Sequence, residues 1–304
     1  MTVVGSYSAA VLLKGERLPT PGETVIAEYF SEIPGGKGSN QAVTASSLGA
    51  NVQFVARIGC DRYGDQALKM YNEKGIGTEY VFRDSKAHTG FGAVIVDNCG
   101  RNLISVAPGA NYDLSVDDID SAEVVLRNSL LVGFQLENRM EVVDYGIRKV
   151  HAMGVKTLLD PAPATRLADD LYPCIDFIKP NEYEARVLTG IHVAGVREAK
   201  QAGRWLIDRG VKAALVTLGE IGVVCVSGTH AAHYAPPQVA AIDTTGAGDI
   251  FSGAFMAAFS GGGTLEESIQ FANRAAAFSV TRLGVIEAIP RLEEVMTSEV
   301  RKAA

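Results

Sequence analysis

Short runs of apolar, often β-branched residues alternate along the chain with longer stretches in which apolar residues recur every three or four positions. The short runs are typical of strands covered on both faces, and the longer stretches are typical of amphipathic helices. Strands are expected at 52–58, 130–134, 155–159, 177–178 and 213–217. Helices are expected at 63–74, 140–153, 183–188, 196–209, 250–259, 265–281 and 292–302. This alternation predicts an α/β fold with a central, mainly parallel β-sheet flanked by helices on both faces.

Two segments, 11–33 and 91–106, break the alternation. Each contains extended stretches separated by turn-forming residues, which are Pro19, Pro21, Gly22, Asp97, Asn98 and Gly100. Such segments favour antiparallel strand pairs. We expect them to form a small separate sheet over one edge of a single α/β domain that spans 1–304, with the extra strands inserted at about 9–34 and 88–107.

The composition is that of a globular protein with a large core. Of the 304 residues, 47% are hydrophobic and 21% are charged, and the net charge of −7 argues against a non-specific nucleic-acid binder. No apolar run reaches about 18 residues, so no membrane span is expected. The N-terminus lacks the basic start and apolar stretch of a signal peptide. The cysteines are far apart and without metal-site spacing, which favours reduced thiols in a cytoplasmic protein.

The strongest candidate for chemistry is the segment DTTGAGD at 243–249, which leads directly into an apolar helix. Its glycines, Gly246 and Gly248, allow a tight turn in which successive N–H groups point into one cavity, and the helix start adds a positive dipole. Asp249 would then be a general base beside a bound phosphoryl group. The alternative is a glycine-rich turn in which Asp249 is only a helix N-cap.

A second glycine-rich segment, GGKGSNQ at 35–41, precedes a helix that runs through Ser46. Its spacing is not that of the phosphate loop G-x-x-x-x-G-K-[ST]. The glycines allow close backbone approach, and Lys37 and Asn40 supply directed donors for hydroxyl or phosphate oxygens. The alternative is a flexible turn capped by Ser39 or Asn40.

Asn181 and Glu184 have two interpretations that the residues alone leave open. Their spacing matches a helix capping box. An amide and a carboxylate could equally order magnesium-bound water near a phosphate.

Two further patterns carry less information. The segment TLGEIG at 217–222 follows a predicted strand, where loops line the ligand crevice of an open parallel sheet. His230 and His233 have a metal-like spacing, but no recognisable third ligand accompanies them, so they are expected at the surface.

Taken together and in this order, these motifs resemble those of the ribokinase family (PfkB-type carbohydrate kinases). The similarity extends from 3–6 to 281–284 and includes GGKGSNQAV at 35–43 and the quite specific DTTGAGD at 243–249. Further similar stretches lie at 19–24, 135–137, 161–164 and 180–182.

The resemblance implies an ATP-dependent kinase that phosphorylates a primary hydroxyl of a small carbohydrate. Asp249 would be the base, and the backbone of Gly246, Ala247 and Gly248 would hold the developing charge. The small sheet would be a lid over the sugar, and the family frequently dimerises through that lid.

The resemblance also assigns ligands to individual residues. Magnesium would be held through water by Asn181 and Glu184. The nucleotide would contact Asn181, Thr217, Gly219, Gly222, Gly248 and Asn273. The sugar would contact Gly36, Lys37, Asn40, Glu137 and Asp249. A monovalent cation, expected to be K⁺, would lie at Asp243, Thr245, Arg282 and Gly284.

The sequence departs from the family pattern at Ser8 and Ala10. Ribokinase-like proteins usually have Asn and Asp there, which bind vicinal sugar hydroxyls. A methyl group accepts no hydrogen bond, and an unpaired buried hydroxyl costs roughly 1–3 kcal/mol. Ribose-like furanoses remain the nearest substrates, with another sugar, a polyol or a nucleoside as the alternative. Ala288 likewise stands where ribokinases can offer a hydroxyl near the cation loop.

Two other functional classes fit this sequence less well than a kinase does. A non-catalytic sugar- or nucleotide-binding regulator would have lost the base or the anion loop, and both are present in this sequence. A nicotinamide-dependent dehydrogenase would need G-x-G-x-x-G after an early strand, and the segment GSYS at 5–8 does not supply it.

Overall fold

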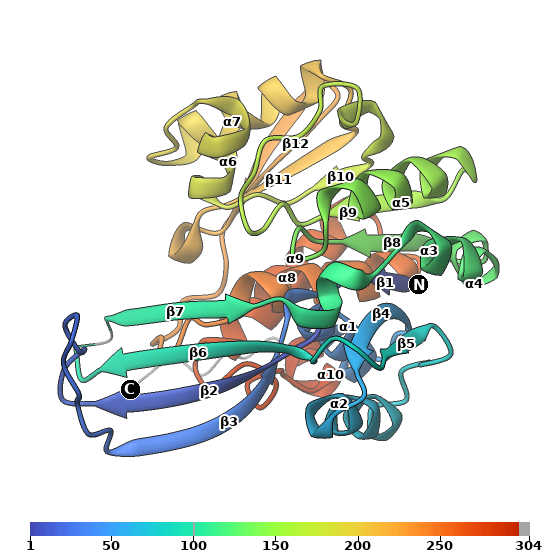
Figure 1. The fold of residues 1–304 in the computed structure, drawn as a ribbon. Helices are drawn as coiled ribbons and strands as arrows, with labels where there is room; N and C mark the ends of the chain where they lie inside the picture. Colours follow the sequence, from blue (N-terminus) through green and yellow to red (C-terminus); the bar gives the residue numbers. More distant parts are fainter. Residues whose placement is uncertain (100, 298–304) are drawn as a thin grey trace.

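The computed structural model describes residues 1–99 and 101–297, and a nine-stranded sheet forms its centre (Figure 1). The strand order is β13-β12-β11-β10-β9-β8-β1-β4-β5, and neighbours from β11 to β5 pair in parallel, whereas β12 is antiparallel to β11 and to β13. The bounds are β1 Thr2–Val4, β4 Gln53–Gly59, β5 Val81–Asp84, β8 Leu131–Phe134, β9 Lys156–Leu159, β10 Phe177–Ile178, β11 Ala213–Thr217, β12 Val223–Ser227 and β13 His230–Tyr234.

Helices cover both faces of this sheet because successive strand residues point to opposite sides. Val3 packs into one hydrophobic cluster and its neighbour Val4 into the other. The first face carries α1 Lys37–Ser47, α2 Arg62–Glu73, α8 Ala247–Ser260 and α9 Leu265–Ser279, with α10 Leu292–Met296 against α9. The second carries α3 Val116–Ser121, α4 Glu123–Arg127, α5 Met140–Ala152, α6 Glu182–Thr189 and α7 Val196–Asp208. The predicted α/β fold is confirmed.

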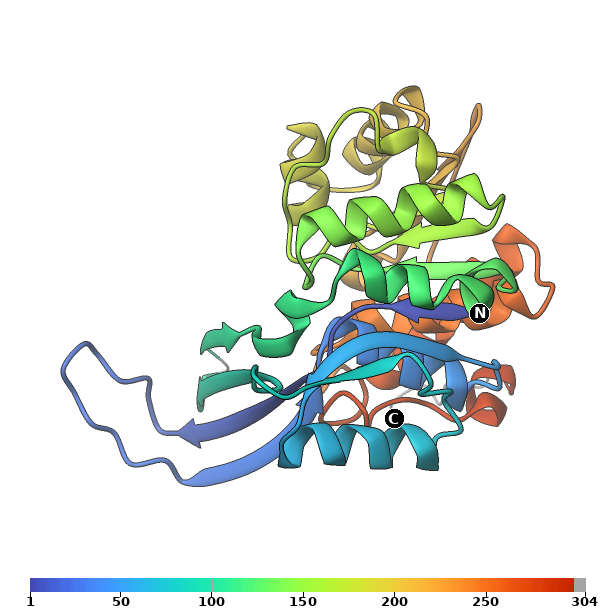
Figure 2. The ribbon, with the colours of Figure 1, turned by 45° about the vertical axis from the view of Figure 1, so that its right-hand side comes forward.

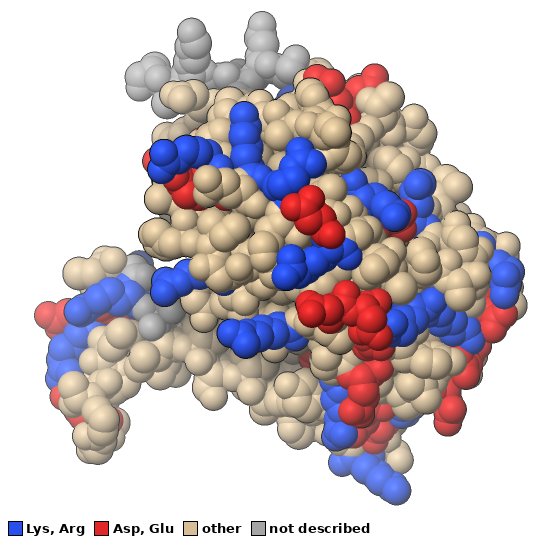
Figure 3. Space-filling view, turned by 90° about the horizontal axis from the view of Figure 1, so that it is seen from above, with Lys and Arg blue, Asp and Glu red and all other residues tan. Residues whose placement is uncertain are grey.

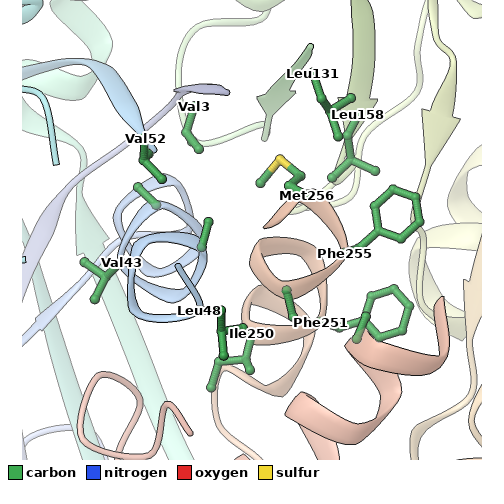
Figure 4. Packing of buried hydrophobic residues seen from close by; sticks show 14 of the residues in the cluster. Val3, Val43, Leu48, Val52, Leu131, Leu158, Ile250, Phe251, Phe255 and Met256 are labelled. Carbon is green, nitrogen blue, oxygen red and sulfur yellow. The ribbon is translucent and has the colours of Figure 1, made fainter. Parts of the chain in front are cut away.

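Helix α8 carries a long run of buried residues, from Asp249 to Met256, and packs against the sheet. Figure 4 shows Phe255 and Met256 facing Leu131 and Leu158 of β8 and β9, and Ile250 lying close to Leu48 after α1. Full burial of side chains of this size stabilises the fold by roughly 1.5–3 kcal/mol each. This packing fixes the position of α8 and therefore the position of the residues at its start.

A second, four-stranded sheet extends away from the main body (Figures 1 and 2). Its order is β3-β2-β6-β7, with bounds β2 Ser8–Gly15, β3 Tyr29–Gly35, β6 Gly90–Asp97 and β7 Asn102–Ala107. The two outer pairs are antiparallel, as the sequence predicts. The central pair, β2 and β6, is parallel and joins the two segments into the expected small sheet; only this parallel pairing was not predicted.

Several short elements were not predicted, namely β1, β5, the β12–β13 hairpin, α3 and α4. The helix predicted at 265–281 ends at Ser279, and Val280 is its C-cap residue. The helix predicted at 292–302 covers Leu292–Met296, and its part from 298 onward lies outside the described residues.

The surface carries charges of both signs. In the view from above, Lys and Arg side chains are interspersed with Asp and Glu (Figure 3). Within residues 1–99 and 101–297, no helix is both long enough and apolar enough to cross a membrane. The four cysteines, Cys60, Cys99, Cys174 and Cys225, are unpaired.

Candidate active site

The predicted site residues gather at one edge of the main sheet, where the parallel strands end. Glu137 follows β8, Asn181 follows β10 and Gly219 follows β11. The starts of α1 and α8 lie at the same edge. A hydrogen bond from Asn40 to Asp249 joins the two glycine-rich segments there. Loops at the carboxyl ends of parallel strands line the ligand crevice of open α/β sheets.

Asp249 lies at the centre of this region, on the first turn of α8. Its side chain is buried, with 6% of the residue exposed. Asn40 of α1 donates to Asp249 Oδ2 over 2.8 Å, and Lys37 Nζ lies 3.8 Å from Asp249 Oδ1. The negative charge of Asp249 raises the pKa of Lys37 above its ordinary value, so this lysine stays protonated. The structure thus brings Lys37 and Asn40 of the first glycine-rich segment to the candidate base Asp249, which ends the second.

The start of α8 leaves backbone amides free. Gly246 is the N-cap residue with φ 74°, and a Cβ there would lie 2.5 Å from Val285 Cγ1, so only glycine fits. Ala247 N–H donates to Thr244 O over 3.3 Å, whereas the N–H groups of Gly246 and Gly248 have no acceptor among the described residues. Asp249 makes no cap hydrogen bond, so the N-cap alternative for this residue is wrong.

The start of α1 packs against residues 6–8, which lead from β1 into β2. Gly36 is its N-cap with φ 88°, and a Cβ there would lie 2.8 Å from Ser8 N. Glu137 accepts hydrogen bonds from Lys37 N over 2.8 Å and from the Ser6 hydroxyl. No side chain caps this helix, so the interpretation of Ser39 or Asn40 as a cap is wrong.

Ser8 and Ala10 lie on β2 of the small sheet. Ser8 Oγ accepts from Asn111 Nδ2 over 3.3 Å. Ala10 pairs with Ile33 of β3 and Gly92 of β6. This part of β2 therefore presents one hydroxyl and one methyl group.

Asn181 and Glu184 form the predicted capping box at the start of α6. Asn181 Oδ1 accepts from Glu184 N over 2.8 Å, and Glu184 Oε2 accepts from Asn181 N over 2.8 Å. Burial raises the pKa of Glu184, and the positive charge of Lys179 opposes this shift. The structure shows the capping role, and the magnesium interpretation of the same pair stays a prediction.

The predicted nucleotide contacts lie around the loop after β11 and the end of β13. Thr217 N donates to Pro180 O over 2.9 Å, and Leu218 N donates to Gly222 O over 2.7 Å, which closes the turn that contains Gly219. Asn273 of α9 donates to Tyr234 O over 2.9 Å. The same carbonyl oxygen lies 2.2 Å from where a Cβ of Gly222 would be, so Gly222 and Asn273 meet at Tyr234.

The two predicted cation loops also meet. Asp243 Oδ1 accepts from Thr245 N over 2.9 Å, and its Oδ2 accepts from Gly284 N over 3.0 Å. These bonds lower the pKa of Asp243, against the opposing effect of its burial. Arg282 forms an ion pair with Glu294, and Ala288 is buried.

A buried polar group behind Asp249 was not predicted from the sequence. Asp160, directly after β9, pairs with Lys179, directly after β10, and also accepts from Gln41 of α1 and Ser252 of α8. The sequence feature that could have indicated this group is the position of Asp160, a charged residue directly after an apolar strand. The pairing itself joins segments 19 residues apart and cannot be read from either strand.

No direct metal cluster was found in the described part of the chain, where no three His, Cys, Asp or Glu side chains converge. His230 and His233 lie on the edge strand β13, and His233 Nε2 is bonded to Ile221 O over 2.7 Å.

Comparisons with known proteins agree with this geometry. The model of the family described as "pfkB family carbohydrate kinase" matches residues 1–292. The chain belongs to the pfkB family of carbohydrate kinases. Family members with similar sequences include the ribokinase of Haemophilus influenzae, 36% identical over 97% of both chains. The deoxyribokinase of Salmonella typhi is 35% identical over 97% of this chain and 96% of its own.

A solved structure extends the similarity to three dimensions. The ribokinase of Arabidopsis thaliana, described in complex with ribose and ATP, is 32% identical, covers 97% of both chains and superposes with a TM-score of 0.89. Membership of the pfkB family makes this chain a carbohydrate kinase, that is, a phosphotransferase with an alcohol group as acceptor.

Proposed function

We propose that this carbohydrate kinase transfers the γ-phosphate of ATP to a primary hydroxyl of a small carbohydrate, with Asp249 as the base. One observation carries the proposal. The Asp249 carboxylate is held by Asn40 and lies one residue from the free amide of Gly248 at the start of α8. A base and an anion-binding helix start are therefore adjacent, as phosphoryl transfer to an alcohol requires.

The reaction follows from these positions. Asp249 takes the proton of the acceptor hydroxyl while the hydroxyl oxygen bonds to the γ-phosphorus. The bond between that phosphorus and the oxygen bridging to the β-phosphate breaks, and ADP leaves. The amides of Gly246 and Gly248, with the backbone of Ala247, stabilise the charge on the transferred group, and this stabilisation supplies most of the catalysis. Lys37 adds a permanent positive charge beside the reacting atoms.

The nucleotide is assigned to the side of the site formed by Thr217, Gly219, Gly222 and Asn273, with Asn181 and Gly248 toward the phosphates. The turn at Gly219 is open, since a Cβ there would meet no atom within 4 Å. The relative described in complex with ATP supports nucleotide binding by this chain.

The charges around Lys37 fit a divalent cation. Four carboxylates act on Lys37, those of Asp249, Asp160, Glu137 and Glu184, and a second ammonium, that of Lys179, pairs with Asp160. Four carboxylates and two ammonium groups give this region a net charge of −2 before any phosphate binds. Mg²⁺ would offset it and neutralise phosphate charge. Asn181 and Glu184 would hold it through water.

The paired loops at 243–245 and 282–284 fit a monovalent cation, for which we propose K⁺. Among the described residues, no hydrogen bond ends on the carbonyl oxygens of Asp243, Thr245, Arg282 or Gly284. Unused carbonyl oxygens from two adjacent loops are suitable cation ligands. Ala288 adds no hydroxyl to this set.

The acceptor is assigned to the side formed by Gly36, Lys37, Asn40 and Glu137, with Ser8 and Ala10 on the small sheet. Asn40 Oδ1 is buried and has no partner among the described residues, so it can accept from a sugar hydroxyl. Relatives named ribokinase and deoxyribokinase, at 36% and 35% identity, support a pentose as acceptor. The methyl group of Ala10 favours a sugar or polyol that needs no carboxylate at this position.

The small sheet is proposed as a lid over the acceptor and as the surface of a homodimer. Its strands carry exposed apolar side chains on both faces, with Tyr29, Ile104 and Val106 on the face of Ala10, and Phe30 and Leu103 on the other. An apolar surface of this kind is typical of a protein contact. The enzyme is proposed to act in the cytoplasm, where ATP is available to it.

A panel of acceptors tests the proposed function. ADP release is measured with ATP and Mg²⁺ in the presence of pentoses, hexoses, polyols and nucleosides. We expect at least one acceptor with a primary hydroxyl to stimulate release, and the product to carry phosphate on that hydroxyl. Nucleotide binding without stimulation by any acceptor would favour the non-catalytic regulator instead.

A further inference from the structure

A buried ammonium group lies directly behind the start of α8, and the mechanism above does not use it. Lys179 is only 4% exposed, and its Nζ lies 2.8 Å from Asp160 Oδ2 and 3.3 Å from Gly248 O. Asp160 is 1% exposed. The ion pair therefore lies inside the protein, and its positive member contacts the residue that precedes Asp249.

The carboxylate of Asp160 is fixed from several elements at once. Its Oδ2 accepts from Gln41 Nε2 of α1 over 2.9 Å and lies 3.0 Å from Ser252 Oγ of α8. Ser252 Oγ also lies 3.1 Å from Gly248 O. Asp160 thus joins the ends of β9 and β10 to both helices whose starts form the site, and Lys179 has little freedom to move.

Stability alone is a weak reason for such a pair. Desolvation of two charges offsets most of their attraction, and apolar side chains of similar size often stabilise a protein equally well. The position of the ammonium suggests another reason. A Cβ on Gly248 would lie 3.2 Å from Lys179 Nζ, so the absence of a side chain at 248 gives the ammonium close access to this peptide.

The contact with Gly248 O also fixes the neighbouring amide. A trans peptide is planar, so its C=O and N–H groups point in opposite directions. When Lys179 holds the Gly248 carbonyl, the N–H of Asp249 is turned the other way, toward the same end of α8 as the free N–H of Gly248. A positive charge behind this peptide also adds to the positive potential of the helix start.

We propose that Lys179, held by Asp160, is a positioning residue of the phosphoryl-transfer site. It orients the Gly248–Asp249 peptide and places a permanent positive charge behind the amides that receive the transferred phosphate. The proposal rests on the proposed function, because it assigns the anion at the start of α8 as the phosphate of a nucleotide.

Three variants separate positioning from stability. Lys179→Met leaves Asp160 as an unpaired buried charge and should lower the melting temperature strongly. The double variant Asp160→Asn/Lys179→Met removes both charges and should regain most of the melting temperature that the single variant loses. Lys149→Met is the matched control, because Lys149 forms ion pairs with Asp120 and Glu123 on the opposite face of the sheet.

The expected result is a folded double variant with a defective site. Its affinity for the magnesium complex of AMP-PNP, measured by calorimetry, should fall about tenfold or more, while adenosine, which has no phosphates, should bind as in the wild type. With an active acceptor, kcat should fall about 100-fold, the order of effect of losing one charge-stabilising donor. Lys149→Met should retain both values.

A double variant that recovers AMP-PNP affinity and kcat together with its melting temperature would overturn the proposal and leave the pair a purely structural role. A wild-type protein that phosphorylates no acceptor would contradict the proposed function instead. In that case the comparison of AMP-PNP with adenosine still reports on Lys179.

Discussion

At the scale of the residue, the site depends on where single carboxylates and amides lie. Asp249 is the third residue of α8, and Asn40 holds one of its oxygens while the other faces Lys37. A carboxylate beside an anion-binding helix start would repel phosphate if it had no chemical task. The adjacent positive charge of Lys37 offsets this repulsion.

Substitution of Ala10 by Asp tests whether residue 10 contacts the sugar acceptor. The new carboxylate can accept from two sugar hydroxyls that a methyl group leaves unpaired. We expect kcat/KM for ribose to rise about tenfold or more for Ala10→Asp, which corresponds to about 1.4 kcal/mol. Steady-state kinetics with ribose as acceptor measure this change in kcat/KM.

Ala93→Asp provides the control, because Ala93 pairs with Val11 and points to the opposite face of the same sheet. It should leave ribose kinetics unchanged. If Ala10→Asp gives no gain, the proposed position of Ala10 in the acceptor pocket is wrong.

At the scale of the element, the tight turn before α8 sets the geometry of the amides. Gly246→Ala introduces a methyl group 2.5 Å from Val285 Cγ1 at φ 74°. We expect it to lower stability and to reduce kcat by about 100-fold or more, since small displacements of reacting groups have effects of this order. Thermal unfolding and kinetics on the folded protein measure the two effects.

Gly154→Ala separates the turn from general strain. Gly154 also has φ 74°, but a Cβ there would meet no atom within 4 Å. This variant should lose about 1 kcal/mol of stability and keep its kcat. Equal kcat values for the two variants would show that the turn at Gly246 does not control the site.

The elements themselves were predictable to the extent that their patterns are local. Helices α5 and α7 and strands such as β11 were found close to their observed bounds, because periodicity and apolar runs report burial directly. The parallel pairing of β2 with β6 and the pairing of Asp160 with Lys179 join distant segments, and no local pattern reports them. Site residues that belong to a sequence motif, such as Asp249, could be proposed from the sequence. Residues that only the tertiary fold brings together, such as Asp160 and Lys179, could not.

At the scale of the whole molecule, the small sheet is the surface that a second copy would cover. Ile104 on β7 is 60% exposed within an apolar surface. We expect wild-type protein to be a dimer and Ile104→Lys to shift it toward monomer, because a buried lysine without a partner is costly. Light scattering coupled to size-exclusion chromatography measures the mass.

Val124→Lys is the matched control for this surface. Val124 on α4 is 64% exposed and lies on the main body, away from the small sheet. It should leave the mass unchanged. A wild-type monomer, or a dimer that Ile104→Lys does not weaken, would contradict the proposed interface.

The most direct test of the account is the transfer of labelled γ-phosphate from ATP to an active acceptor by the wild type and by Asp249→Asn, with AMP-PNP binding measured in parallel. The amide keeps the size of the side chain and removes the base. The account predicts that transfer falls by about 10²–10⁴-fold while AMP-PNP binds with similar affinity. Full transfer by Asp249→Asn would contradict it.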